Sequence, residues 1–159
     1  MIEKTLILLK PDTVQRCIAG QIISRFESTG LKIIGMKMVR VEKDFSKKHY
    51  KAHVEKEFYK GLEEFITVSP IIAIVLEGIS AVETVRKMVG ATEPKTAQPG
   101  TIRGDYAHHS YEYTNNKGIA IKNLIHASGT KDEAEREVAL WFSKSEIYSY
   151  ETAHDTHVL

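Results

Sequence analysis

Two short runs of consecutive apolar residues constrain the fold of this chain more than any other feature. Ile71 to Leu76 are six apolar residues in a row, three of them isoleucine and one valine, and Thr5 to Leu9 form a shorter run. Neither run has a helical period, so we expect two buried strands. Pro11 should end the first strand, because proline cannot donate to a strand ladder but suits the first turn of a helix.

The other expected elements alternate around these strands. We expect helices from Ile18 to Gly30, from Asp44 through about His53, from Tyr59 to Ile66, from Ala81 to Val89 and after a cap at Thr130, and strands at Leu31–Val41 and Lys122–His126. Gly78 should break the strand before it, Ala91–Gly104 should be a long ordered loop, and the polar tail from Glu151 should fray. This order predicts an α+β sandwich of the ferredoxin-like, split βαβ type, with an antiparallel four-stranded sheet covered by helices. A doubly wound sheet would need more βα units.

Composition narrows the class of protein. The 159 residues are 42% hydrophobic and 27% charged, which is typical of one globular domain and excludes a disordered or fibrous chain. A formal charge of +1 argues against a general binder of nucleic acid or of a membrane surface. The longest apolar run is too short to span a bilayer, and the amino-terminal residues lack the layout of a signal peptide. The single cysteine, Cys17, fits a reducing compartment and is expected as an apolar filler on a helix, so we expect a cytoplasmic protein.

Two clusters of residues could hold phosphates. Lys10 stands where the first strand should end, and a lysine there can meet a phosphate as a point charge, although a solvated side chain is the alternative. Between Arg86 and Asp105, glycine and proline turns alternate with arginine and threonine donors that suit a polyphosphate, although a charged surface loop has the same composition. A P-loop is excluded, because the chain has no glycine-rich GxxxxGK[ST] sequence.

A third cluster could supply a nucleophile. His126 lies within Asn123–Ser128, and a neutral imidazole can attack phosphorus if an acceptor holds its other ring nitrogen. Glu137 and Ser128 are candidates for that partner, and a packed core histidine is the alternative. A metal site is disfavoured, since His49 and His53 are expected on a solvated helix face and no HExxH sequence occurs.

Taken together, these pieces resemble the nucleoside diphosphate kinase family over Glu3 to about Tyr150. The resemblance rests on KPD at Lys10–Asp12, on PGTIRGD at Pro99–Asp105 and on NLIHAS at Asn123–Ser128, in that order and with that spacing. It implies a ping-pong transfer of the γ-phosphate of ATP, or of another nucleoside triphosphate, to a nucleoside diphosphate, which maintains the nucleotide pools. It further implies Mg²⁺ delivered with the nucleotide and a homohexamer, with a homotetramer as the alternative.

The resemblance also implies a role for particular side chains. His126 would carry the phosphoryl group, Glu137 would orient its ring and Ser128 would support Glu137. Phe58 would stack on the base, with Leu62 near that platform. The remaining residues would contact phosphates or ribose: Lys10, Tyr50, Arg86, Thr92, Arg103 and Asn123.

The chain departs from the family pattern in four places. Ala127 replaces a frequent glycine, and Gly129 replaces the usual aspartate. The segment 106–122 is about ten residues longer than the usual connection, where ordinary loops are short. The last residues, 151–159, do not follow the common family ending. These departures leave a nucleotide-binding regulatory protein without turnover as a second hypothesis, ahead of a histidine metal site and of sequence-specific DNA binding.

Overall fold

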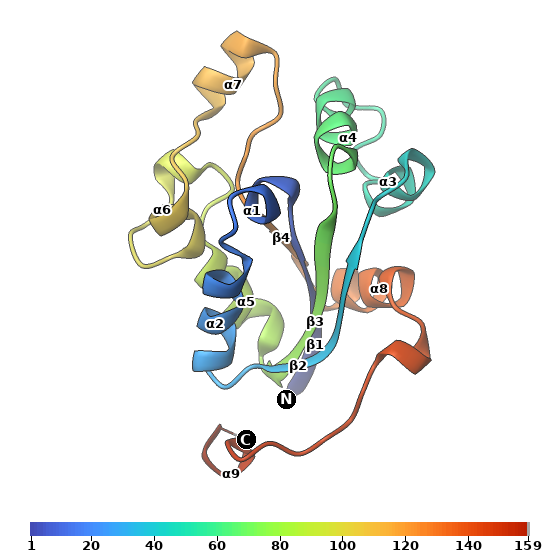
Figure 1. Cartoon of the computed structure of the whole chain (residues 1–159), viewed down its shortest axis with the longest axis vertical. Coiled ribbons are helices and arrows are strands. Elements are labelled where there is room, and N and C mark those ends of the chain that lie inside the picture. Colours follow the sequence, from blue (N-terminus) through green and yellow to red (C-terminus); the bar gives the residue numbers. More distant parts are fainter. Residues whose placement is uncertain (159) are drawn as a thin grey trace.

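The computed structural model describes residues 1–158 and contains a four-stranded antiparallel sheet with helices on both faces (Figure 1). The strands are β1 (Ile2–Leu9), β2 (Lys32–Val39), β3 (Ile71–Ile79) and β4 (Ile125–Ala127), in the sheet order β2-β3-β1-β4. The helices are α1 (Pro11–Gln15), α2 (Ala19–Ser28), α3 (Lys43–His49), α4 (Tyr59–Thr67), α5 (Ala81–Val89), α6 (Ile102–Tyr106), α7 (Tyr111–Lys117), α8 (Lys131–Trp141) and α9 (Asp155–Val158), with 3₁₀ turns η1 (Pro94–Thr96) and η2 (Lys144–Glu146). The ferredoxin-like arrangement predicted from the sequence is confirmed.

The continuous apolar runs reflect a sheet that is covered on two sides. Ile7 and Leu9 of β1 point into one core, which includes residues of α2 and α5, whereas Leu6 and Leu8 point into a second core with residues of α4 and α8. All four side chains are fully buried. In Figure 1, α2, α5 and α6 accordingly lie on one side of the sheet and α3, α4 and α8 on the other.

Several of the expected strand boundaries are wrong: β1 begins at Ile2 rather than Thr5, and β2 ends at Val39 rather than Val41. β3 continues past Gly78, which pairs with Glu3; a Cβ at this position would lie 2.7 Å from the Leu31 side chain, so the glycine permits close packing and does not end the strand. β4 begins only at Ile125, because Leu124 has a φ of 71° and leaves the extended conformation.

The expected starts and ends of helices are partly correct. Pro11 opens α1, Gly30 follows α2 with a φ of 83°, and Thr130 caps α8 by accepting a hydrogen bond from the Glu133 amide at 3.2 Å. The carboxylate of Glu133 binds the amide of Gly129, however, rather than that of the cap residue. α3 ends at His49 instead of His53, and Glu42 takes the cap position that was expected for Asp44, which lies in the first turn.

The two long connections, the tail and Cys17 also differ from expectation. Segment 106–122 contains α7, and the expected loop 91–104 contains η1 and the start of α6. The tail from Glu151, expected to fray, instead contains α9 and is attached through Asp155, which Lys32 binds at 3.0 Å. Cys17 is exposed in the turn after α1, with a φ of 56°, so it is not a helix filler. Within residues 1–158, no helix has the length and apolar character needed to cross a bilayer.

Candidate active site

β4 presents His126 to a carboxylate on α8. His126 Nε2 lies 2.9 and 3.0 Å from the two carboxylate oxygens of Glu137, and Ser128 Oγ donates to Glu137 Oε2 at 2.6 Å. Because a carboxylate only accepts, the hydrogen of the neutral ring lies on Nε2 and Nδ1 keeps its lone pair. The His126 side chain is 20% exposed, so the ring is not sealed from solvent. The structure thus brings together the three residues that the sequence grouped, with Nδ1 available for attack.

Hydrogen bonds keep the buried Glu137 ionised. Burial alone would raise the pKa of this carboxyl, but the hydrogen bond and charge of His126, together with His49 and Ser128, outweigh it and hold the pKa below its usual value. An ionised Glu137 is the stronger acceptor for the ring hydrogen, so the environment fixes the orientation of His126 as well as its tautomer.

A buried ammonium group lies at the end of β1. Lys10 Nζ donates to Asn123 Oδ1 at 2.7 Å, and Asn123 Nδ2 donates to the carbonyl of Thr92 at 2.8 Å. Burial, reinforced by the charge of Arg103, lowers the pKa of Lys10 to about 8, against an opposing effect of Asp12. The sequence-predicted residues Lys10, Thr92 and Asn123 therefore form one connected group.

Arg103 is a second buried cation and holds the segment before His126. Its Nε donates to the carbonyl of Asn123 at 3.1 Å, and its Nη atoms donate to Gly90 at 3.1 Å and to Ile125 at 2.6 Å. Burial and the neighbouring charge of Arg86, which lies on α5, lower the pKa of Arg103 to about 10. Arg103 thus supports the backbone of the site as well as supplying positive charge.

Residues at the start of α1 hold the backbone of Leu124, two residues before His126. Asp12 Oδ2 accepts from the Leu124 amide at 3.0 Å, Thr13 Oγ1 donates to the Leu124 carbonyl at 2.6 Å, and the Lys10 amide donates to the same carbonyl at 2.8 Å. Leu124 has a positive φ, which costs a non-glycine residue about 1–3 kcal/mol. No role was predicted for Asp12, which lies in the KPD motif, or for Thr13 beside it, although their position just after Lys10 and Pro11 is the available signal.

The hairpin of α3 and α4 supplies aromatic side chains on the other side of the site. Tyr50 is buried, its ring centroid lies 6.5 Å from that of His126, and burial raises the pKa of its phenol. Its hydroxyl has no hydrogen-bond partner among residues 1–158. Phe58 is 56% exposed at the start of α4, beside His53 and Lys56, and Leu62 packs partly buried against the core. The hairpin therefore offers an open aromatic face near a buried hydroxyl.

His49 and Trp141 are neighbours of His126 that sequence reasoning missed. The structure buries His49, which contradicts the expected solvated helix face, and Trp141 Nε1 donates to His49 Nδ1 at 3.1 Å. The His49 ring lies edge-on to His126, with centroids 4.7 Å apart. The available signals are the pairing of His49 with Tyr50 and the one-turn spacing from Glu137 to Trp141 on α8.

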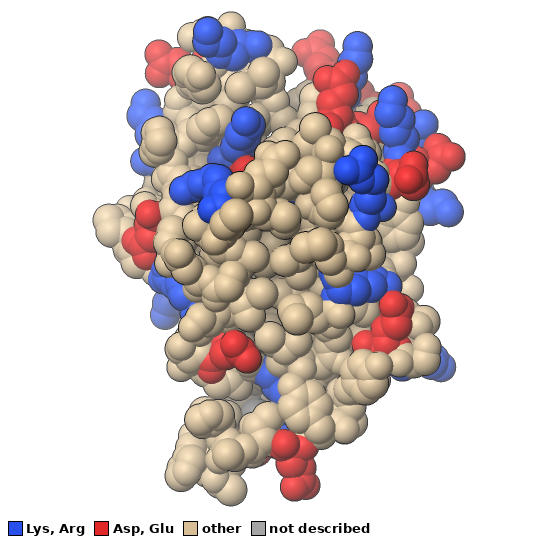
Figure 2. Space-filling view, viewed as in Figure 1, with Lys and Arg blue, Asp and Glu red and all other residues tan. Residues whose placement is uncertain are grey.

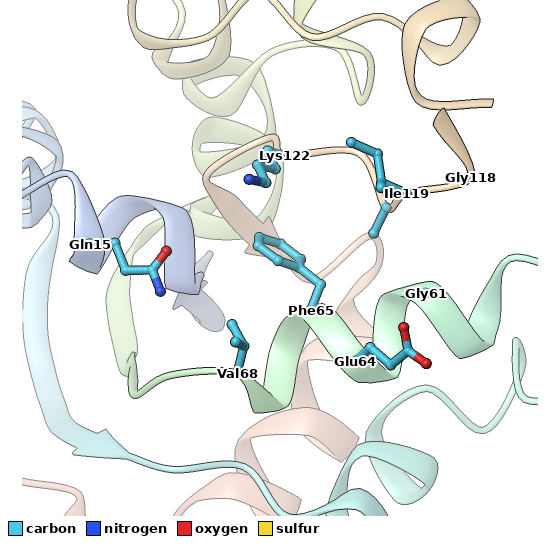
Figure 3. Close-up of a pocket in the computed structure, with 9 residues that line it drawn as sticks. Gln15, Gly61, Glu64, Phe65, Val68, Gly118, Ile119 and Lys122 are labelled. Carbon is cyan, nitrogen blue, oxygen red and sulfur yellow. The ribbon is translucent and has the colours of Figure 1, made fainter. Parts of the chain in front are cut away.

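A separate groove of about 350 Å³ lies between α4 and the end of the lengthened segment (Figure 3). Its lining residues are Gln15, Gly61, Glu64, Phe65, Val68, Gly118, Ile119, Ala120 and Lys122. None of them belongs to the predicted site, and Lys122 is the one cation of the lining.

On the face shown in Figure 2, basic and acidic side chains are interspersed around an uncharged centre.

One group of side chains has the spacing of metal ligands. His49, His126 and Glu137 place potential ligand atoms within 4.8 Å of one another. These atoms already serve internal contacts, since Glu137 accepts from His126 and His49 Nδ1 accepts from Trp141. The geometry therefore favours a hydrogen-bonded nucleophile over a resident metal centre.

Comparisons with known proteins agree on one family. The family model described as nucleoside diphosphate kinase matches residues 3–147. The nucleoside diphosphate kinase of Pyrococcus abyssi is 51% identical over 153 residues, which cover 96% of this chain and 92% of the relative. A transition-state mimic of the Borrelia burgdorferi enzyme with bound vanadate and ADP superposes with a TM-score of 0.95 at 42% identity, covering 99% of this chain and 96% of that one. The Halobacterium salinarum enzyme in complex with CDP has a TM-score of 0.87 at 39% identity, with coverage of 98% and 97%.

Proposed function

Because this chain belongs to the nucleoside diphosphate kinase family, we propose that His126 carries the phosphoryl group between the two nucleotides. The chain is a nucleoside diphosphate kinase, and kinases of this family use a divalent metal ion with nucleotide substrates. The observation that carries the assignment of His126 is its bond to Glu137, which holds Nε2 and leaves the Nδ1 lone pair free.

The reaction proceeds in two balanced steps at this nitrogen. Nδ1 of His126 attacks the γ-phosphorus of a nucleoside triphosphate, an N–P bond forms, and the bond to the β-phosphate oxygen breaks to release a diphosphate. A second diphosphate then attacks the phosphorus through a terminal oxygen, and the N–P bond breaks. The hydrogen on Nε2 stays on the ring throughout, where Glu137 stabilises the positive charge that the phosphorylated imidazole acquires.

The cations and donors around Asn123 form the proposed phosphate cradle. Lys10, Arg86 and Arg103 would neutralise the charge that develops on the phosphoryl oxygens, while Thr92 and Asn123 would contact phosphate or ribose. Mg²⁺ enters as part of the substrate, bound to the nucleotide phosphates, since magnesium prefers phosphate and water oxygens to an all-protein cage. Lys10 and Arg103 are buried and held by hydrogen bonds, so they can stabilise charge by preorganisation without rearranging, whereas Arg86 is exposed on α5.

The hairpin of α3 and α4 forms the proposed nucleoside site. The exposed face of Phe58 would stack on the base, with Leu62 beneath the platform, and the unpaired hydroxyl of Tyr50 would donate to the nucleotide. A phenylalanine face accepts any base, so we expect broad base specificity.

We also infer that the enzyme assembles from several copies of one domain spanning residues 1–159. β2 is an edge strand, and its residues Met36 and Met38 are each more than half exposed. An unpaired, partly apolar edge can pair with the same edge of a second copy. We propose a homohexamer, with a homotetramer as the alternative, and sedimentation equilibrium distinguishes the two. The exposed, free thiol of Cys17 supports the reducing cytoplasm as the location.

Labelling with [γ-³²P]ATP and Mg²⁺ tests the proposed nucleophile. The wild-type protein should form an acid-labile, alkali-stable phosphoprotein that loses its label to added diphosphate, and His126→Ala should not label. His108→Ala is the matched control, because His108 is exposed and lies outside the site. Stable labelling of His126→Ala would refute the assignment, and a wild-type protein that binds nucleotide without labelling would support the regulatory alternative.

A further inference from the structure

His49 is a buried imidazole next to the proposed nucleophile, yet it makes no hydrogen bond to His126. Its side chain is 1% exposed, and Nε2 has no hydrogen-bond partner among residues 1–158. An unpartnered buried donor costs about 1–3 kcal/mol, which an apolar side chain at this position would avoid. The hydrogen bonding of this ring is therefore decided at Nδ1, its one partnered nitrogen.

The indole of Trp141 determines the protonation state of His49. An indole N–H can only donate, so His49 Nδ1 must accept with its lone pair, and the single hydrogen of the neutral ring lies on Nε2. Burial and the charge of His126 lower the pKa of His49 to about 3, and Glu137 opposes them. The other groups facing the ring are Lys10 and Arg136, which lower the pKa further, and the neutral phenol of Tyr50.

The carboxylate of Glu137 lies between two imidazoles. Its Oε1 is 3.0 Å from His126 Nε2 and 3.7 Å from His49 Nδ1. A hydrogen on His49 Nδ1 would make this atom a donor and draw the carboxylate away from His126 and Ser128. Because the indole hydrogen already occupies the Nδ1 lone pair, that competing bond cannot form while the Trp141 contact persists.

We propose that Trp141 is a positioning residue, which reserves the Glu137 carboxylate for His126 by fixing His49 as the neutral tautomer with its hydrogen on Nε2. The proposal rests on the proposed role of His126 as the phosphorylated residue. Trp141 and Glu137 lie one turn apart on α8, so the same helix supplies both the orienting carboxylate and the donor that protects it.

The direct test is the tautomer of His49 in the wild-type protein. Two-dimensional ¹H–¹⁵N spectra that detect long-range couplings in histidine rings should show Nδ1 of His49 without a hydrogen from pH 5.5 to 8.5. A hydrogen on Nδ1 in this range would overturn the proposal, and this measurement requires no variant to fold.

Trp141→Phe tests the consequence for catalysis, because phenylalanine keeps an aromatic ring and removes the donor. We expect the neutral His49 ring to move its hydrogen to Nδ1, and the rate of phosphoenzyme formation at saturating Mg·ATP to fall about tenfold, the lower end of the loss when a partner orienting a ligating histidine is removed. KM for ATP should change little, because neither residue belongs to the proposed nucleotide site. An unchanged rate together with a shifted tautomer would overturn the proposal.

Two further variants separate positioning from packing. Phe45 packs edge-on against Trp141 with ring centroids 4.7 Å apart, so Phe45→Leu should loosen the same cluster without changing the tautomer or the rate of phosphoenzyme formation. The double variant Trp141→Phe/His49→Leu has no side-chain donor at position 49 to bind Glu137 and should recover the lost activity. Failure of this rescue would overturn the positioning role while leaving the labelling of wild type intact, whereas a wild-type protein without label would overturn the proposed function as well.

Discussion

Replacement of Glu137 by glutamine tests how the site activates its nucleophile. The substitution conserves the shape of the side chain and removes the charge that accepts from His126 Nε2 and Ser128 Oγ. A hydrogen bond to a charged group contributes about 1.5–3 kcal/mol, against about 0.5–1.5 kcal/mol for a neutral pair, so the loss of charge in two bonds weakens the arrangement by roughly 2–3 kcal/mol. If this whole loss of 2–3 kcal/mol raises the barrier of the transition state, phosphoryl transfer slows by about 30- to 150-fold.

The amide can also invert the tautomer of the nucleophile. If the glutamine NH₂ group donates to His126 Nε2, the ring hydrogen moves to Nδ1 and blocks attack on phosphorus. The comparable change in a serine protease triad costs about 10⁴ in kcat, which sets the upper bound of the expected loss. We therefore expect Glu137→Gln to slow phosphoenzyme formation by between about 30-fold and about 10⁴-fold, with KM nearly unchanged.

Rapid-quench labelling under single-turnover conditions measures this step apart from product release. Glu135→Gln is the matched control, since Glu135 is exposed two residues earlier on the same helix and should leave the rate unchanged. Urea unfolding of each variant shows whether the fold persists. A folded Glu137→Gln protein that labels within threefold of the wild-type rate would refute the reasoning about the carboxylate.

Three other perturbations address the cations and the lengthened segment. Because burial lowers the pKa of Lys10 to about 8, kcat/KM for Mg·ATP should fall as the pH rises through 8 in a coupled assay from pH 6.5 to 9.5. This fall should be absent from Lys10→Arg, because arginine stays charged over the whole range. If Lys10→Arg showed the same fall as the wild type, Lys10 would be excluded as its source. Over the same range the folded protein binds fewer protons at this lysine than the unfolded chain, so the contribution of Lys10 to the free energy of unfolding should rise between pH 8 and pH 10.5. Arg103→Lys cannot reproduce three bonds to backbone carbonyls and should lower the free energy of unfolding by about 2–4 kcal/mol, besides slowing transfer; wild-type stability in urea would contradict this structural role. Deletion of Tyr111–Lys117 should leave labelling of His126 intact, because α7 makes none of the contacts described for the site, and a folded but unlabelled deletion variant would show the opposite.

The parts of the fold that the sequence predicts are those with a local pattern. The strand at Ile71–Leu76 was predictable because a sheet buried on both faces produces an unbroken apolar run, and α8 because Thr130 marks its start. The predicted end of the strand at Gly78 was wrong because a glycine that permits close packing of a neighbouring side chain cannot be told in the sequence from one that ends a strand. The docked tail was not predictable, since its contacts join residues more than 100 positions apart and leave no period in the sequence.

In the site, too, contacts between residues close in sequence were predicted and contacts between distant residues were not. His126, Ser128 and Glu137 were grouped in advance, and the structure places them in contact, because they lie on a short strand, directly after it and on the helix that follows. The Trp141 contact with His49 spans 92 positions, and each residue alone resembles part of an ordinary amphipathic helix. Amphipathic patterns specify which face is buried, but they do not specify which polar atoms meet inside.

The strand that bears the nucleophile has only three residues, and this brevity has a kinetic consequence. Three paired positions give β4 few ladder bonds of its own, so its attachment depends on the side chains of α1 that grip Leu124. The junction of β1 and α1 and the strand β4 should therefore open together as one cooperative unit. In native-state hydrogen exchange, a weakened grip such as Thr13→Val should accelerate deuterium uptake at the amides of Leu124 and Ser128, while the central strand β3 keeps its protection.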